Sequence, residues 1–286
     1  MCTKQNNLLF LLLICLVACT KEQIPASSQQ SVTASQISDS RYDIVGRQRL
    51  VTCPTGDATY PTSQALLWLP QGYGDNDTSY PLIINLYGQG QCNTDINTML
   101  ESNTMSEYIA NGFDPVGYNK NEQKTYEYIV FSPQCPTAWG WSAPQVKVML
   151  ATLKDSLRID DSRVYLTGFS AGGWGLWSCI TDDESLCSQF AAIAPISSAA
   201  ADHPDLITNV DKYGIACWNI CGDQDAFYPN AVAYTNIIND NNPPIKAQLT
   251  SLQGVGHSAW AQAYDSNWKD NEMNTNLYDW LIQYKR

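Results

Sequence analysis

Histidine and basic side chains are scarce in this chain. Its 286 residues include two histidines, and its 16 Lys and Arg residues stand against 28 Asp and Glu residues, which gives a net charge of −12. This excess of negative charge repels phosphate backbones and anionic lipid headgroups, so we expect no nucleic-acid partner. The sequence also contains no C-x-x-C pair. With His203 and His257 as its only imidazoles, we expect no zinc site and no metal cofactor.

The chain begins with an apolar run that is too short to cross a bilayer. Leu8 to Val17 comprises ten residues and follows the positive charge of Lys4, as in a signal peptide. The run ends in Leu16-Val17-Ala18-Cys19, which resembles the lipobox of bacterial lipoproteins. The resemblance implies cleavage before Cys19 and lipid attachment to Cys19. The alternative is an ordinary secretory signal with a chance cysteine.

These features predict three parts of the chain. Residues 1–18 would be a lipoprotein signal peptide, and residues 19–40, rich in Ser, Gln, Thr and Ala, a flexible tether. Residues 41–286 would be a single domain, because 44% hydrophobic residues can fill a sizeable core. We therefore expect a lipid-anchored protein of the bacterial cell envelope, periplasmic or on the cell surface, that does not span the membrane.

Export would place the cysteines in an oxidising compartment. Seven follow Cys19, an odd number, so at least one stays unpaired within the chain: Cys53, Cys92, Cys135, Cys179, Cys187, Cys217 and Cys221. Cys217 and Cys221 lie in one predicted strand, about 13 Å apart, which is too far for a disulfide. The turn-rich stretch between Cys179 and Cys187 predicts a bridge between those two.

Short apolar runs bounded by Pro and Gly alternate with helical patterns from residue 41 onward. The runs have the length of buried strands: Ala65–Leu69, Leu82–Tyr87, Tyr126–Phe131, Arg163–Thr167, Phe190–Ile196, Ile215–Cys221 and Ile245–Leu252. Apolar residues at helical spacing occur in residues 146–157 and 277–284. This alternation predicts an α/β fold, with a mainly parallel sheet covered by helices on both faces.

A G-x-S-x-G motif, Gly168 to Gly172, directly follows one of these predicted strands. A strand, a sharp turn at Ser170 and a following helix form a nucleophile elbow, in which glycines leave room for the tight turn. The N–H of Ala171 would stand at the helix start without a helical partner, free to bind an oxyanion. The alternative is a glycine-rich turn with a solvated serine.

A serine nucleophile needs a base, usually histidine, and an acid that orients it. In α/β-hydrolases the order along the chain is Ser, Asp or Glu, then His. His257 fits this order, whereas His203 precedes the acid candidates and is interpreted as a surface residue. The turn after the penultimate predicted strand holds both Asp223 and Asp225, and spacing alone does not decide between them. Either could instead cap the turn.

Five segments of the chain resemble segments that recur, in the same order, in one branch of the α/β-hydrolases: Pro81–Gly90, Phe131–Pro136, Arg163–Gly173, Phe190–Pro195 and Gly254–Trp260. That branch contains feruloyl and acetyl-xylan esterases, polyhydroxybutyrate-depolymerase-like esterases and predicted peptidases similar to prolyl oligopeptidase. The resemblance spans roughly residues 60–286 and implies an α/β-hydrolase fold and a serine hydrolase without a cofactor.

The resemblance also implies roles for particular residues. The family's acid falls on Asp225, in the Gly-x-x-Asp-x-x-x-Pro pattern that begins at Gly222, and its second oxyanion amide falls on Gln89. The chain has Tyr87-Gly88 where the family usually has His-Gly. That histidine is not a triad member, so the departure bears on the shape of the loop and the substrate fit and not on the triad.

Aromatic residues flank these motifs and predict a wall for sugar faces or phenolic rings: Trp139, Trp141, Trp174 and Trp260. The alternative is that they pack in the core. We predict a carboxylic ester hydrolase that works through an acyl-enzyme, with Ser170, His257 and Asp225 as its triad and the amides of Ala171 and Gln89 as its oxyanion hole. Its substrate would be a small-molecule or polysaccharide ester, such as an acyl or feruloyl group on polysaccharide. A serine peptidase and a catalytically silent glycan-binding lipoprotein are the alternatives.

Overall fold

A nine-stranded sheet forms the centre of the protein, described here by a computed structural model of residues 42–286 without residues 139 and 241. These residues all belong to one compact unit. The expected signal peptide, tether and lipidated Cys19 lie outside the described residues, as does Trp139. Within the described part, no helix is long and apolar enough to cross a membrane.

The strands follow the order β1-β2-β3-β7-β4-β8-β9-β10-β11 across the sheet. From β7 to β11 neighbouring strands run parallel, whereas β1, β2 and β3 form an antiparallel edge that joins β7. The strands span Ile44–Val45 (β1), Gln48–Pro54 (β2), Thr62–Trp68 (β3), Tyr80–Leu86 (β4), Ile129–Pro133 (β7), Ile159–Phe169 (β8), Ala192–Ile196 (β9), Ala216–Gly222 (β10) and Gln248–Leu252 (β11). The predicted mainly parallel sheet is confirmed.

Alternation along the strands supplies both faces of the sheet with apolar side chains. In β8, Val164 and Leu166 belong to the core on one face, and Tyr165 and Phe169 belong to the core on the other. Strand side chains alternate in direction, so a strand buried on both faces must be apolar throughout. The continuous apolar runs of the sequence therefore reflect a sheet that is covered on both sides.

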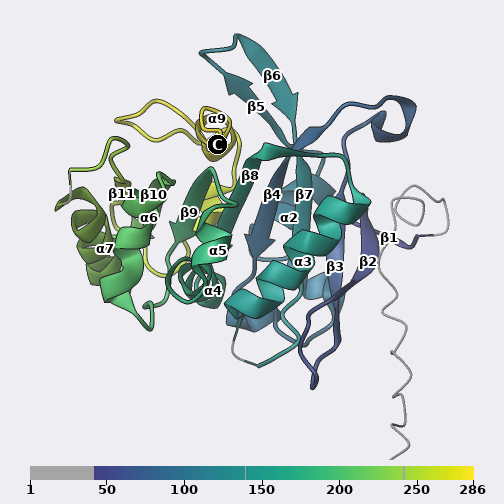
Figure 1. Ribbon diagram of the computed structural model, residues 1–286, viewed down its shortest axis with the longest axis horizontal. Helices are drawn as coiled ribbons and strands as arrows, with labels where there is room; N and C mark the ends of the chain where they lie inside the picture. The colour runs from purple at the N-terminus through teal and green to yellow at the C-terminus, as the bar shows by residue number, and fades with distance from the viewer. Residues whose placement is uncertain (1–41, 139, 241) are drawn as a thin grey trace, which may run out of the picture. The chain divides into compact units, whose positions relative to one another are not determined.

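Helices pack on each of these two cores (Figure 1). The first core holds side chains of α3 (Ala143–Ser156), α4 (Ala171–Thr181), α5 (Glu184–Cys187), α6 (Asn209–Lys212) and α7 (Tyr228–Asp240). The second holds side chains of α2 (Met105–Ala110), α8 (Trp260–Ala263) and α9 (Leu277–Leu281). The prediction of helices on both faces is confirmed. Helix α3 overlaps the predicted stretch 146–157 but begins at Ala143, and α9 lies within the predicted stretch 277–284.

A two-stranded hairpin, β5 (Val116–Asn119) and β6 (Lys124–Glu127), projects beyond the central sheet in Figure 1. It is fastened to the C-terminal helix α9 and the residues that follow. The Tyr118 N–H donates to Asp279 Oδ1 at 2.7 Å, and the Asn119 amide donates to the Ile282 carbonyl at 2.6 Å. The predicted single run Tyr126–Phe131 is thus divided between this hairpin and β7.

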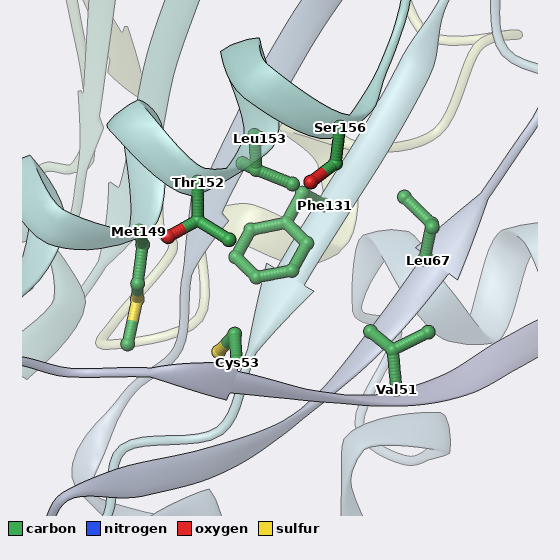
Figure 2. A pocket seen from close by; sticks show the side chains of 8 residues that line it. All are labelled: Val51, Cys53, Leu67, Phe131, Met149, Thr152, Leu153 and Ser156. Carbon is green, nitrogen blue, oxygen red and sulfur yellow. The ribbon is translucent and has the colours of Figure 1, made fainter. Parts of the chain in front are cut away.

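A small apolar cavity lies between α3 and the strands β2, β3 and β7, and Figure 2 shows the side chains around it. Apart from two hydroxyl groups, its lining is hydrocarbon and sulfur: Val51, Cys53, Leu67, Phe131, Met149, Thr152, Leu153 and Ser156. Since the lining side chains other than Thr152 and Ser156 belong to the first core, the cavity marks a place where that core is incompletely filled.

The cysteine predictions have different outcomes. All seven cysteines among the described residues are free thiols, so the predicted bridge between Cys179 and Cys187 is not formed. Cys187 Sγ is instead directed at the end of α4, where it lies 3.3 Å from the Ile180 carbonyl oxygen. Cys217 and Cys221 both lie in β10 and are not bridged, as their spacing predicts.

Candidate active site

Ser170 occupies the sharp turn between β8 and α4. Its backbone has φ 54° and ψ −120°, a combination that side-chain-bearing residues rarely adopt. The turn is held from outside: the Ser170 N–H donates to the Ile196 carbonyl at 3.1 Å, and the Ala199 N–H donates to the Ser170 carbonyl at 3.1 Å. These bonds to β9 and the loop after it fix the strained serine in place.

Glycine is required on both sides of this serine. A Cβ on Gly172 would lie 2.0 Å from the Leu86 carbonyl oxygen, and one on Gly168 would lie 2.4 Å from the Gly172 carbonyl oxygen. Real Cβ atoms do not approach so closely, so the two glycines of the motif allow α4 to begin directly against β4 and β8. The geometry is that of the predicted nucleophile elbow.

The side chains of Ser170, His257 and Asp225 form one hydrogen-bonded chain. His257 Nε2 lies 2.8 Å from Ser170 Oγ, and His257 Nδ1 lies 2.9 Å from Asp225 Oδ2. Asp225 follows β10 and His257 follows β11, so the carboxyl ends of neighbouring parallel strands bring them together. The structure thus unites the three residues that the sequence singled out as nucleophile, base and acid.

Asp225 is buried, with 1% of its side chain exposed, and is held as a carboxylate. Burial alone would raise its pKa, but hydrogen bonds from the Phe227 N–H, at 3.0 Å, and from His257 lower the pKa overall. The Cys221 thiol also points at this carboxylate, with Sγ 3.6 Å from Oδ2. A charged, buried carboxylate is suited to orienting a histidine and stabilising its protonated form.

Asp223 has a different place from Asp225. Its Oδ1 accepts from the Gly254 N–H at 2.7 Å, and its own N–H donates to the Leu252 carbonyl at 3.0 Å. It therefore ties the turn after β10 to the loop that leads from β11 to His257. The contact with His257 belongs to Asp225, the aspartate that the family pattern indicated.

The turn Gly88–Gln89 lies beside the nucleophile. A Cβ on Gly88 would meet the Phe169 ring at 2.9 Å and Ser170 Cβ at 3.4 Å, so the backbone here is in close contact with the elbow. Gln89 begins the short 3₁₀ helix η2 (Gln89–Gln91), and Ala171 begins α4. The N–H groups of first helical residues have no partner within their own helix. The amides of Gln89 and Ala171 therefore stay the predicted donors to an oxyanion.

Tyr87, where the family usually has histidine, anchors the loop that covers this side of the site. It is fully buried, its hydroxyl donates to the Met99 carbonyl at 3.2 Å, and the same oxygen accepts from the Ser106 N–H at 3.2 Å. Its ring packs edge-on against Phe169 at 5.4 Å. Tyr87 therefore joins the oxyanion turn to the segment η3 (Ile96–Leu100) and α2.

Aromatic rings border His257 on two sides. Phe227 and Trp260 both meet its imidazole edge-on, with ring centroids 5.3 Å and 5.4 Å away. Phe227 is a neighbour that the sequence analysis did not single out, although it lies in the turn that carries Asp225. Trp174 is partly exposed on α4, and His203, as expected, is exposed at the start of a 3₁₀ helix.

Trp141 is a correction to the predicted substrate wall. Its side chain is fully buried in the first core, so no face is left for a ligand. A Cβ on Gly175 would lie 2.4 Å from Trp141 Cβ, which shows how closely α4 packs against it. Trp141 is a packing residue, and the partly exposed Trp174 and Trp260 remain as candidates.

No protein-family model matches this sequence, and no curated protein matches it. Solved structures do match the fold. A thermostable esterase shares 22% identity at a TM-score of 0.62, over 84% of this chain and 63% of that one. This chain therefore spans less than two thirds of the thermostable esterase.

Two further structures match most of their own length. A ferulic acid esterase shares 16% identity at a TM-score of 0.52, over 76% of this chain and 94% of that one. S-formylglutathione hydrolase from Staphylococcus aureus shares 15% identity at a TM-score of 0.54, over 78% and 96%. Together with the sheet order, these likenesses show that the chain has the α/β-hydrolase fold, as its sequence predicted.

Proposed function

We propose that this protein is a serine esterase that hydrolyses carboxylic esters through an acyl-enzyme. The observation that carries the proposal is the continuous chain from Ser170 Oγ through His257 to the buried Asp225, with both contacts shorter than 3 Å. A serine hydroxyl becomes a nucleophile only when a base takes its proton, and the contacts of His257 with Ser170 and Asp225 support His257 as that base.

The proposed reaction has two halves, formation of the acyl-enzyme and its hydrolysis, and the same catalytic groups act in both. His257 Nε2 takes the proton from Ser170 Oγ as that oxygen attacks the ester carbonyl, and the Ala171 and Gln89 amides stabilise the resulting oxyanion. His257 then gives the proton to the leaving alcohol, which leaves an acyl group on Ser170. A water molecule, activated by the same histidine, releases the acid. Asp225 stays charged and stabilises the imidazolium in both halves.

The openness of the site supports esters on large molecules. The His257 side chain is 40% exposed, and Ser170 is partly exposed beside it. A nucleophile near the surface can reach an acyl group while the leaving alcohol remains part of a polymer. With Trp174 and Trp260 as aromatic surfaces nearby, we propose acyl or feruloyl groups on polysaccharide as the substrate class.

The proposed location follows from the N-terminal sequence alone. A lipid on Cys19 and a tether over residues 19–40 would hold the enzyme on a membrane of the bacterial envelope, periplasmic or at the cell surface. There it would meet polysaccharide fragments, and no nucleic-acid or metal partner is part of the proposal.

Hydrolysis assays test the activity directly. We expect the purified protein to cleave p-nitrophenyl acetate or butyrate, methyl ferulate or acetylated xylan, and to react covalently with a fluorophosphonate probe at Ser170. Ser170→Ala should abolish both, whereas Ser188→Ala, which removes an exposed hydroxyl on a surface turn, should retain both. Cleavage of peptide amides in preference to every ester would indicate a peptidase. A folded wild type that neither cleaves esters nor labels would overturn the proposal.

A further inference from the structure

Two cysteines from separate segments meet beside the oxyanion turn. Cys92 directly follows η2, whose first residue is Gln89, and Cys135 lies two residues after the end of β7. The two are 43 residues apart in the sequence. The fold nevertheless places the two cysteines side by side, and the interaction between their thiols shifts the pKa of each.

The backbone around the two sulfur atoms is tightly joined. The Asn93 N–H donates to the Cys135 carbonyl at 2.8 Å. The side-chain amide of Gln134 donates to the Gln91 and Thr94 carbonyls, at 3.1 Å each. These three bonds fix the segment after η2 against the segment after β7 on both sides of the thiol pair. The approach of the sulfur atoms is therefore a property of the fold and not of one side-chain rotamer.

Both thiols are buried and reach toward the site. Cys92 is 7% exposed and its Sγ lies 3.5 Å from the Gly88 carbonyl, the residue in contact with Ser170. Cys135 is fully buried, with its Sγ 2.8 Å from the Gly140 carbonyl. A covalent bond here would connect the oxyanion turn to the end of a central strand.

We propose that Cys92 and Cys135 are a disulfide-forming pair that fastens the oxyanion turn to the end of β7. The bond requires that the two thiols approach each other between segments that hydrogen bonds already join. Formation of the bond does not depend on the proposed esterase activity.

The pKa shifts of the two thiols favour thiol–disulfide exchange. The hydrogen bond from Cys92 lowers the pKa of the Cys135 thiol, and the same contact raises the pKa of Cys92. The thiolate is the form that attacks a disulfide, so the pair holds one sulfur closer to its reactive state. By contrast, burial raises the pKa of Cys53 to about 12, and it raises the pKa of Cys217 as well.

The oxidant would be a small disulfide such as oxidised glutathione. One thiolate of the pair attacks it, breaks its S–S bond and releases one glutathione thiolate, which takes up a proton. The second cysteine loses its proton, attacks the mixed disulfide and releases the second glutathione. The protein gains one S–S bond and loses two hydrogens, and the oxidant becomes two thiols.

The test is to map the disulfides of the folded full-length protein after incubation with oxidised glutathione. We expect a mass loss of about 2 Da, from the two hydrogens removed, and a peptide that links Cys92 to Cys135. Cys92→Ser and Cys135→Ser should each eliminate that peptide. Cys217→Ala, which removes a buried thiol within β10, should retain it. The proposal is overturned if both cysteines stay open to alkylation after denaturation of the oxidised protein, or if another pair is linked.

A second measurement shows whether the disulfide stabilises the oxyanion turn or forms without any effect on it. Oxidised wild type should unfold at a temperature on the order of 10 °C above the reduced protein, since the bond closes a long loop of the unfolded chain. Amide exchange of residues 88–94 should slow in parallel. An unchanged unfolding temperature with unchanged exchange would reject the fastening role. These measurements do not use ester hydrolysis. The disulfide proposal and the esterase proposal can therefore each fail while the other holds.

Discussion

The two aspartates after β10 provide a matched pair of substitutions. Asp225→Asn keeps the shape of the side chain but offers an amide to His257 Nδ1, which favours the wrong tautomer. We expect kcat to fall by a factor on the order of 10⁴. Asp223→Asn leaves that contact intact and weakens only the cap on Gly254. It should change kcat little and lower the free energy of unfolding by about 1 kcal/mol.

Steady-state kinetics and urea unfolding of both variants distinguish the two roles. If Asp223→Asn is the inactive variant and Asp225→Asn is near normal, the acid has been assigned to the wrong residue. The serine hydrolase proposal would survive that result, since it rests on the contact between Ser170 and His257.

Individual residues differ in how far their sequence context determines them. The spacing of the motif and the order of the triad residues were enough to select Ser170 and His257, because the elbow turn imposes its own local sequence. Trp141 could not be placed in this way. Whether a tryptophan is buried depends on what packs against it, and here that is the backbone at Gly175, in another element. The absence of a side chain at Gly175 is what lets α4 approach Trp141 so closely.

Among the helices, α3 offers the clearest test of packing because the apolar cavity lies beneath it. Leu153 is 5% exposed and lines that cavity. Leu153→Ala should lower the free energy of unfolding by about 2–3 kcal/mol, near the low end for such changes, since part of the space around it is already empty. Asp155→Ala, on the exposed side of the same helix, should change it by less than about 0.5 kcal/mol. Chemical denaturation of the two variants gives both values.

Elements buried on both faces were predicted well, whereas several partly exposed ones were missed. The strands β4 and β8 to β10 are continuous apolar runs that stand out in the sequence. Strand β2 and the hairpin β5–β6 are partly exposed and carry Gln, Arg, Thr, Lys and Glu among their residues, so no apolar run marks them. Helix α7 was also missed, because Pro229 and three asparagines interrupt its helical pattern. These elements are specified by what they pack against.

Across the molecule, Glu122 joins three segments that are distant in sequence. The carboxylate of this hairpin-turn residue contacts Arg163 at the start of the central β8 at 2.6 Å and Lys285 near the C-terminus at 2.8 Å. The hydrogen bond from Lys285, a second from Tyr126 and the charge of Arg163 lower the pKa of Glu122 to about 2. The folded pKa is thus below the unfolded one, so this stabilisation is present above about pH 4.5 and is lost as the pH falls toward 2.

We therefore expect Glu122→Gln to lower the free energy of unfolding by about 1 kcal/mol at pH 7, since Glu122 is partly exposed. The difference from wild type should shrink as the pH falls below 4. Urea midpoints measured from pH 7 to pH 3 test this, with the exposed Glu101→Gln as control. If the difference in the free energy of unfolding between wild type and variant increases as the pH falls, the assigned direction of the pKa shift is wrong.

At the scale of the whole chain, the proposed anchor can be tested in cells. Labelling with a palmitate analogue should mark the wild type, because the lipobox-like sequence predicts acylation at Cys19. Cys19→Ala should lose the label, whereas Cys15→Ala, four residues earlier, should keep it. Label that persists in Cys19→Ala would refute the lipoprotein proposal and leave an ordinary secretory signal.

The backbone conformation of Ser170 lowers the stability of the fold, although the proposed activity requires this serine. A side-chain-bearing residue at φ 54° and ψ −120° costs on the order of 1–3 kcal/mol, whereas glycine adopts such a conformation at little cost. Ser170→Gly should therefore raise the unfolding temperature while eliminating hydrolysis. Laboratory evolution that selects this protein for heat resistance alone would enrich variants that have lost the nucleophile. Each round would need a screen for turnover to keep the serine in the population.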